Sequence, residues 1–213
     1  MILIGQYDSP FVRRVAIALR LYGMEFEHRP WSVFGDAERL GAINPLRRVP
    51  TLVLDDGEVL TESFCILDAL DQMVGEGRAL IASTGPDRRH ALRISALAVG
   101  LADKAVSLVY ERAVHDRATP MWVERCRTQI SSVLDALEAD RARQPGDWWF
   151  GANIGHADIA VAVALFFLSD AHPGLFDLNH WPKLARHSIR CEALPPFLEL
   201  KQTFKVTPSG KTG

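Results

Sequence analysis

Cysteine is scarce in this chain of 213 residues, and its scarcity argues against a disulfide-stabilised class of protein. Cys65, Cys126 and Cys191 are odd in number and far apart, which matches neither a disulfide framework nor a metal-binding motif. The seven histidines likewise lack the spacing of metal ligands, so we expect no metal site. The reducing cytoplasm is the location that this use of cysteine favours.

Long apolar runs and an excess of charge of either sign are also missing. No apolar run reaches the roughly 18 residues that a membrane-spanning helix needs, and the first residues lack the basic lead and cleavage site of a signal peptide. A net charge of −2 gives no reason to expect nucleic acid or an anionic membrane as a partner. No glycine-rich phosphate loop is present. We therefore expect a soluble cytoplasmic protein that binds neither membrane nor nucleic acid.

The first third of the chain alternates strand-like and helical segments. Hydrophobic residues make up 48% of the chain, enough for the core of one large domain or two small ones. The expected strands and helices, in order, are a strand at 2–4, a helix at 10–22, a strand at 26–30, a weak helix or irregular segment at 33–40, hairpin strands at 51–54 and 58–60, and a helix from 61 to about 75. This order predicts an α/β unit with a mixed sheet and a thioredoxin-like arrangement.

Strand patterns end where glycine and proline gather at 77–87, and only helical patterns follow. Long ones cover 88–114 and 120–143, and shorter ones end the chain. The segment 157–169 is apolar on every side, which is typical of a buried helix. The sequence thus predicts a thioredoxin-like α/β domain with a four-stranded mixed sheet at 1–76, a linker at 77–87 and an all-α helical bundle at 88–205.

Val49-Pro50 opens the predicted strand at 51–54 and is the stretch around which we expect the site. Proline has no N–H for a sheet ladder, so it belongs at the first residue of a strand. A cis X-Pro bond costs only about 0.5–1 kcal/mol and turns the chain sharply. Such a turn would leave the N–H and C=O of Val49 free to hold an extended peptide. An ordinary edge strand that starts with Val-Pro is the alternative interpretation.

Three motifs in one order resemble the cytosolic glutathione transferase family, in its bacterial form with a serine-type active site. They are Ser9-Pro10 at the start of the first helix, Val49-Pro50 before the third strand, and Glu62-Ser63 at the start of the next helix. The resemblance covers nearly the whole chain, and the second and third motifs at this spacing are its specific part. The segment 155–158 also resembles the family's helix-capping segment, with Gly155 where the family usually has Ser or Thr.

The resemblance implies glutathione as co-substrate and Ser9 as the residue that activates its thiol. A free thiol has a pKa of about 8.5, and a hydroxyl donor at a helix N-terminus stabilises the thiolate. Ser9 would then donate a hydrogen bond rather than act as a base or nucleophile, although it could also be a simple N-cap. Tyr7 competes for the role, because some classes of the family use a tyrosine near the end of the first strand.

The same resemblance assigns the remaining contacts with glutathione. Glu62 would pair with its ammonium group and Ser63 would bind its γ-glutamyl carboxylate, although both residues could simply start a helix. The backbone of Val49, beside Pro50, would hold the cysteinyl part. The candidates for the glycyl carboxylate are Arg48, Arg47 and Trp31, with solvated arginines as the alternative. Weaker candidates for the site are Phe11, Asp103 and Tyr110. Asp103 would approach the ligand across a dimer interface, and Tyr110 would line the electrophile site.

The activity implied is conjugation of glutathione to small hydrophobic electrophiles by a homodimer, in a detoxification role. The segment 9–12 has no cysteine, which disfavours thiol reductase chemistry, and we expect Cys65, inside the following helix, to be buried and inert. One alternative is a glutathione-dependent isomerase or dehalogenase on the same scaffold. Zeta-type isomerases, however, carry a Ser-Ser-Cys-Ser-like motif after the first strand, where this chain has Ser9-Pro10-Phe11. The other is a non-catalytic transferase-like module for binding or assembly.

Overall fold

The computed structural model describes residues 1–113 and 117–205. Backbone contacts divide the chain into two compact units: residues 1–88 with 193–202, and, of the described residues, 89–113 and 117–192 with 203–205. Within the described ranges, no helix combines the length and the apolar character needed to cross a membrane. The limits expected from the sequence, at 76 and 88, stay predictions.

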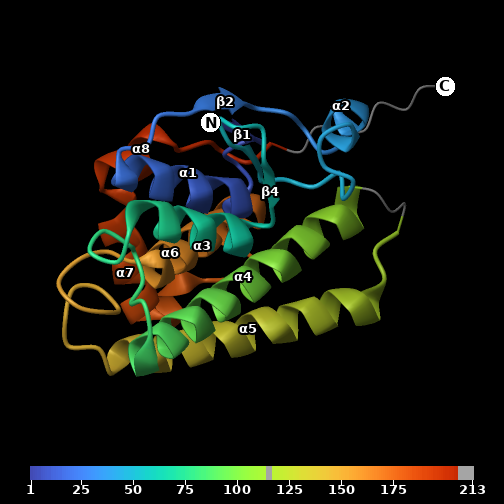
Figure 1. Ribbon diagram of the computed structural model, residues 1–213. Coiled ribbons are helices and arrows are strands. Elements are labelled where there is room, and N and C mark those ends of the chain that lie inside the picture. The colour runs from blue at the N-terminus through green and yellow to red at the C-terminus, as the bar shows by residue number, and fades with distance from the viewer. Residues whose placement is uncertain (114–116, 206–213) are drawn as a thin grey trace. The chain divides into compact units, whose positions relative to one another are not determined.

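The first unit is built on a four-stranded mixed sheet (Figure 1). Its elements are β1 (Ile2–Ile4), α1 (Pro10–Tyr22), β2 (Glu27–Arg29), α2 (Ala37–Gly41), β3 (Thr51–Val53), β4 (Val59–Thr61), α3 (Ser63–Val74) and α8 (Pro195–Glu199). The strand order is β2-β1-β3-β4, with β1 parallel to β2 and antiparallel to β3, and β3 antiparallel to β4. The predicted thioredoxin-like sheet is confirmed.

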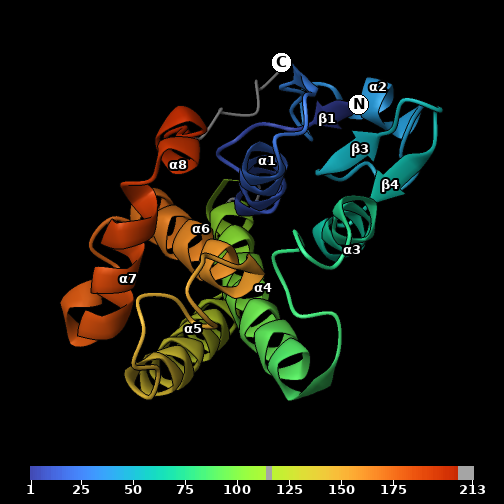
Figure 2. The same ribbon diagram turned by 60° about the vertical axis from the view of Figure 1, so that its left-hand side comes forward.

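Helix α1 begins and ends where its sequence predicts. Ser9 caps the N-terminus, its hydroxyl accepting a hydrogen bond from the N–H of Val12 at 3.4 Å, and Pro10 occupies the first turn. Gly23 ends the helix in the left-handed conformation, with φ of 67°. The apolar side of α1 is buried, and α1 packs against α3 (Figures 1 and 2).

The strand register brings three chain segments to one edge of this sheet. Ile4, the last residue of β1, is paired with Thr51, the first of β3, and Thr51 with Thr61, the last of β4. The chain therefore leaves β1, enters β3 and leaves β4 at the same edge. The segments there are the start of α1, the Val49-Pro50 turn and the start of α3.

The second unit contains only helices among its described residues. They are α4 (Gly85–Ala113, whose first turn belongs to the first unit), α5 (Pro120–Ala142), α6 (His156–Ala171), a 3-10 turn η1 (Leu178–His180) and α7 (Pro182–Glu192). Helix α7 packs against α5 and α6, and α6 is buried along nearly its whole length, as its apolar sequence predicts. Residue 114 of the predicted first helix lies outside the described residues.

The capping segment of α6 centres on the buried carboxylate of Asp158. Its oxygens accept the N–H groups of Trp149 at 2.8 Å and Gly155 at 2.9 Å, so Gly155 contributes backbone only. His187 of α7 brings its Nε2 to 3.5 Å from Asp158. Burial raises the pKa of Asp158 to about 6 and lowers the pKa of His187 to about 4. The expected capping role of this segment is confirmed.

Candidate functional site

Ser9 stands at the sheet edge with its hydroxyl proton available. Because the oxygen accepts the Val12 N–H, the hydroxyl hydrogen can be donated to another group. The helix N-terminus adds partial positive charge at this position. The arrangement suits an anion placed over the first turn of α1.

Gly5 lets the first turn of α1 approach the Val49-Pro50 turn. A Cβ at residue 5 would lie 2.5 Å from Cγ2 of Val12 and 2.8 Å from Cβ of Val49, closer than carbon atoms pack. Its φ of 129° is also a conformation that favours glycine. Ser9 and Val49 therefore lie on either side of a contact that only glycine permits.

The Val49-Pro50 peptide bond is cis, as the sequence indicated. Among the described residues, no hydrogen bond in a turn or loop uses the N–H or C=O of Val49. The buried amide of Asn44 stabilises the turn through hydrogen bonds to residues on both sides of it. Its Nδ2 donates to the Arg48 carbonyl at 3.0 Å and to Thr51 Oγ1 at 2.9 Å. Sequence reasoning missed Asn44 as a site residue, although the Asn-Pro pair marked a turn.

Glu62 precedes α3 in an unusual backbone conformation. Its φ of 63° and ψ of 124° are rare for a residue with a Cβ, and such outliers persist where surrounding structure holds them. Its carboxylate pairs with Nη1 of Arg48 at 3.1 Å, and the side chains are 48% and 59% exposed, respectively. The two residues expected at opposite ends of the ligand thus contact each other.

Ser63 begins α3 and rests on a buried arginine that sequence reasoning missed. Nη1 of Arg14 donates to Ser63 Oγ at 3.4 Å, and its guanidinium lies 4.6 Å from the ring centre of Phe64. Both Arg14 and Ser63 are almost fully buried. Arg14 appeared in the sequence only as one of two adjacent basic residues in an amphipathic helix.

Tyr7 lies in a different environment from Ser9. Its ring stacks on His28 with centroids 3.9 Å apart, and its N–H donates to Gln202 Oε1 at 3.0 Å. Burial raises the pKa of Tyr7, and the charges acting on its hydroxyl are those of Arg20 and Glu199. Arg20 sits in the last turn of α1, about 15 Å along the axis from its first turn.

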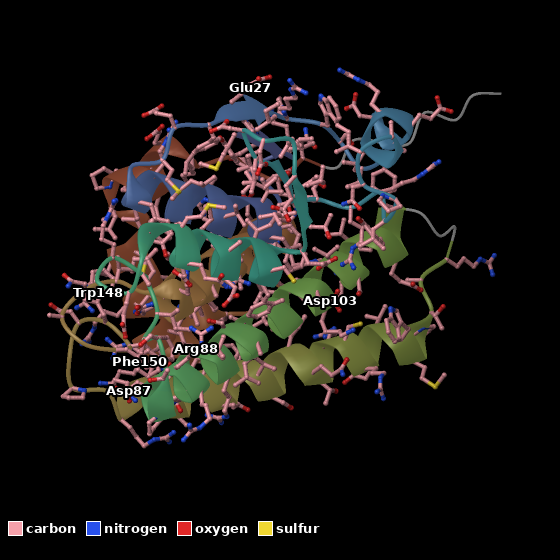
Figure 3. The ribbon with its side chains drawn as sticks, in the orientation of Figure 1. Glu27, Asp87, Arg88, Asp103, Trp148 and Phe150 are labelled. Carbon is pink, nitrogen blue, oxygen red and sulfur yellow. The ribbon has the colours of Figure 1, made fainter. Side chains whose placement is uncertain are left out.

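Trp31 and Arg47, the two other candidates for the glycyl carboxylate, contact residues of their own loop. The ring centre of Trp31 lies 4.4 Å from the guanidinium of Arg39. Arg47 packs beside Gly41, where a Cβ would come within 2.8 Å of the Arg47 Nε. The weaker candidates are spread over two helices. Phe11 lies half-buried in the first turn of α1, and Tyr110 lies on α4. Asp103 also lies on α4, as Figure 3 shows.

The expectation for Cys65 was wrong, because its side chain is exposed whereas Cys126 and Cys191 are buried. The buried face of α3 is formed by Ser63, Ile66, Leu67 and Leu70. Helical geometry therefore turns residue 65 to the opposite side. In residues 1–113 and 117–205, no group of three or more His, Cys, Asp or Glu side chains could hold a metal ion.

Fold and edge together define a class of protein: a thioredoxin-like domain with a cis Val-Pro turn at one sheet edge, followed by a helical domain. The N-terminal and C-terminal domain models of glutathione S-transferase match residues 3–78 and 120–190. Glutathione S-transferase U4 of Arabidopsis thaliana is 39% identical to this chain. The matched region covers 91% of this chain and 88% of the Arabidopsis protein. The chain belongs to the glutathione S-transferase family.

Two further comparisons bear on the chemistry. A maleylacetoacetate isomerase of Pseudomonas aeruginosa is 28% identical, over 92% of this chain and 93% of its own. A glutathione S-transferase from Methylobacterium radiotolerans, solved in complex with glutathione sulfonate, superposes with a TM-score of 0.86 at 31% identity. That comparison covers 96% of this chain and 97% of the solved one.

Proposed function

We propose that this protein conjugates the thiolate of glutathione to small hydrophobic electrophiles and that Ser9 activates the thiol. The observation that carries the proposal is the convergence of Ser9, the backbone of Val49 and the Glu62-Ser63 pair at one sheet edge. The relative from Methylobacterium radiotolerans, which carries glutathione sulfonate, supports the ligand class.

Each of these groups has a part suited to its chemistry. The Ser9 hydroxyl donates to the sulfur, and the helix N-terminus adds positive charge, so the pKa of the bound thiol falls. More of the thiol is then ionised at pH 7 than the few per cent that is ionised in solution. The N–H and C=O of Val49 pair with the cysteinyl backbone. Ser63, at the start of α3, binds the γ-glutamyl carboxylate, and Glu62 binds the ammonium group.

Arg48 takes part through an exchange of partners. Its pair with Glu62 is half-exposed at both ends, and such pairs are worth about 1 kcal/mol or less. The ligand ammonium therefore displaces Arg48 from Glu62 at little cost. The released guanidinium then reaches for the glycyl carboxylate, where a charge-assisted hydrogen bond forms.

A second candidate activity is glutathione-dependent isomerisation. The specific observation in its favour is the similarity to the Pseudomonas aeruginosa maleylacetoacetate isomerase. The run Ser9-Pro10-Phe11 weighs against it, because Phe11 stands where the Ser-Ser-Cys-Ser motif of zeta-type isomerases has its cysteine. Turnover of maleyl compounds against chlorodinitrobenzene separates the two activities.

We also propose a cytoplasmic homodimer, as is usual in the family, with Asp103 near the ligand of the second copy and Tyr110 at the electrophile. Sedimentation of the full chain tests the dimer. A monomer at micromolar concentration would contradict it.

The decisive experiment measures glutathione binding by calorimetry and turnover with chlorodinitrobenzene. Ser9→Ala should lower kcat/KM about a hundredfold, in the range seen when a donor to a developing anion is removed, while the Kd for glutathione changes little. Tyr7→Phe is the matched control and should keep near-normal turnover. No binding at millimolar glutathione would refute the proposed function, and a larger loss in Tyr7→Phe would move the activating role to Tyr7.

A further inference from the structure

Residues 197–202, which comprise the end of α8 and the segment after it, return to the first unit although every helix of the second unit precedes them in the sequence. We call them the strap. The strap holds the first turn of α1 through the buried side chain of Arg13. Its Nε donates to the Leu200 carbonyl at 3.1 Å and its Nη2 to the Phe197 carbonyl at 2.9 Å. These carbonyls offset the cost of burying the charge and fix the strap to the turn that Ser9 caps.

The end of the strap reaches the loop between β1 and α1. The side-chain amide of Gln202 accepts the N–H of Tyr7 on its Oε1 at 3.0 Å. Because a backbone N–H can only donate, the oxygen of the amide rather than its nitrogen faces Tyr7. Among the described residues, no backbone carbonyl accepts this N–H. The strap therefore supplies a hydrogen-bond partner that the backbone of the loop does not.

This hydrogen bond bears on Ser9, because Tyr7 and Ser9 share one tight turn. The N–H of Ser9 donates to the Gln6 carbonyl at 3.2 Å, so residues 6–9 form a four-residue turn with Tyr7 at its second position. The carbonyl of Ser9 accepts the N–H of Arg13 at 2.9 Å. Ser9 thus lies between two residues, Tyr7 and Arg13, that are both bound to the strap. A change in the backbone of this turn would redirect the Ser9 hydroxyl, and the strap opposes such a change at both ends.

We infer that Gln202 is a positioning residue that orients the Ser9 hydroxyl toward the thiol of glutathione. The inference rests on the proposed function and extends it to a residue far from Ser9 in the sequence. Gln202 acts through the backbone of Tyr7 rather than on the ligand. A hydrogen-bond donor stabilises a developing anion only when it is held at the right place, and a displacement of about 1 Å can cost about a hundredfold in rate. The strap fixes that place before glutathione binds.

The test is a double-mutant cycle between Gln202 and Ser9 on the full chain. Gln202→Met keeps the length of the side chain and removes the acceptor for the Tyr7 N–H. It should lower kcat/KM with chlorodinitrobenzene about tenfold at neutral pH, roughly the most that the loss of one ordinary hydrogen bond costs. The Kd for glutathione should change less than about threefold, since the lost interaction serves the thiolate. In the Ser9→Ala background, Gln202→Met should cost less than about twofold, because no hydroxyl is left to orient.

A pH profile adds a readout that a merely structural role would not move. A misplaced hydroxyl should raise the pKa of the bound thiol, so the loss in Gln202→Met should shrink as the pH rises and the thiolate forms without help. The ultraviolet absorbance of the thiolate, titrated in the complex with glutathione, measures that pKa directly. A loss of the same size at every pH would contradict the inference.

Glu199→Gln is the matched control, because it changes another polar contact between the strap and α1. Glu199 pairs with Arg20 at 2.9 Å, in the last turn of the helix rather than at Ser9. This variant should leave turnover and the pKa of the bound thiol unchanged.

The outcomes separate the inference from the proposed function. If Gln202→Met lowers turnover equally with and without the Ser9 hydroxyl, Gln202 is merely structural and the inference fails, while the proposed function stands. If Ser9→Ala keeps full turnover, or if the wild type does not bind glutathione, the proposed function fails and the inference with it. Should Gln202→Met not fold, Gln202→Ala, which also removes the acceptor, decides in the same cycle.

Discussion

At the scale of single residues, the sheet edge depends on positions where a small side chain or a rare conformation lets two segments meet. Gly5 stands between Val12 and Val49, and Glu62 holds a positive φ before α3. Neither residue provides the proposed chemistry of Ser9. Both fix the distances over which that chemistry would act.

Gly5→Ala should destabilise the protein through crowding as well as backbone strain. The added Cβ would meet Val12 and Val49 at 2.5 Å and 2.8 Å, and overpacking of this kind costs about 1–3 kcal/mol. Gly57→Ala is the matched control, because φ at Gly57 is also positive, at 89°, yet no atom lies within 4 Å of its added Cβ. Urea unfolding measures both variants. Equal losses of unfolding free energy would show that crowding at Gly5 contributes nothing.

At the scale of elements, helices α6 and α7 meet through two buried groups whose titrations oppose each other. Asp158 has a raised pKa of about 6 in the fold, against 3.8 for a free group, so its contribution to stability is complete below pH 3.8 and is lost as the pH rises through 6. His187 has a lowered pKa of about 4, against 6.5, so its contribution is complete above pH 6.5 and is lost as the pH falls through 4. Between pH 4 and 6 the two effects offset each other.

His187→Gln should remove one side of this balance. The unfolding free energy of the variant, taken relative to the wild type, should then fall as the pH rises from 4 to 6, because only the Asp158 contribution remains in that window. Urea unfolding at several pH values measures the effect, with His180→Gln as the control, since the His180 side chain is exposed. Parallel curves for His187→Gln and the wild type would contradict the opposed titrations.

At the scale of the whole molecule, glutathione should stabilise the folded chain by mass action. Ligand at a hundred times Kd adds about 2.7 kcal/mol to the unfolding free energy when it binds the folded state alone. Thermal unfolding with and without glutathione measures this. Cysteinylglycine, which lacks the γ-glutamyl group bound at Ser63, is the control and should stabilise far less. Equal shifts with both compounds would mean that the γ-glutamyl end is not bound.

Much of this architecture could be predicted from the sequence, because its elements carry strong local patterns. Ser9-Pro10 and Gly23 fix the ends of α1, and the Val49-Pro50 pair indicated the cis turn that the structure contains. Asn44 and Arg14 could not be predicted as buried, because polar residues are expected at the surface and only the tertiary partners reveal why these are not. Cys65 was misplaced for a different reason: a free cysteine is usually buried, whereas the spacing of Ile66, Leu67 and Leu70 turns residue 65 away from the core.

The exposed position of Cys65 has a practical consequence. Its thiol lies in the first turn of α3, two residues after Ser63, while the other two cysteines are enclosed. A maleimide fluorophore will therefore attach at this one position of the native chain without prior mutagenesis. Because residue 65 faces away from Ser63, the label would sit outside the proposed glutathione site, and its emission would follow by stopped flow any rearrangement of α3 that accompanies binding.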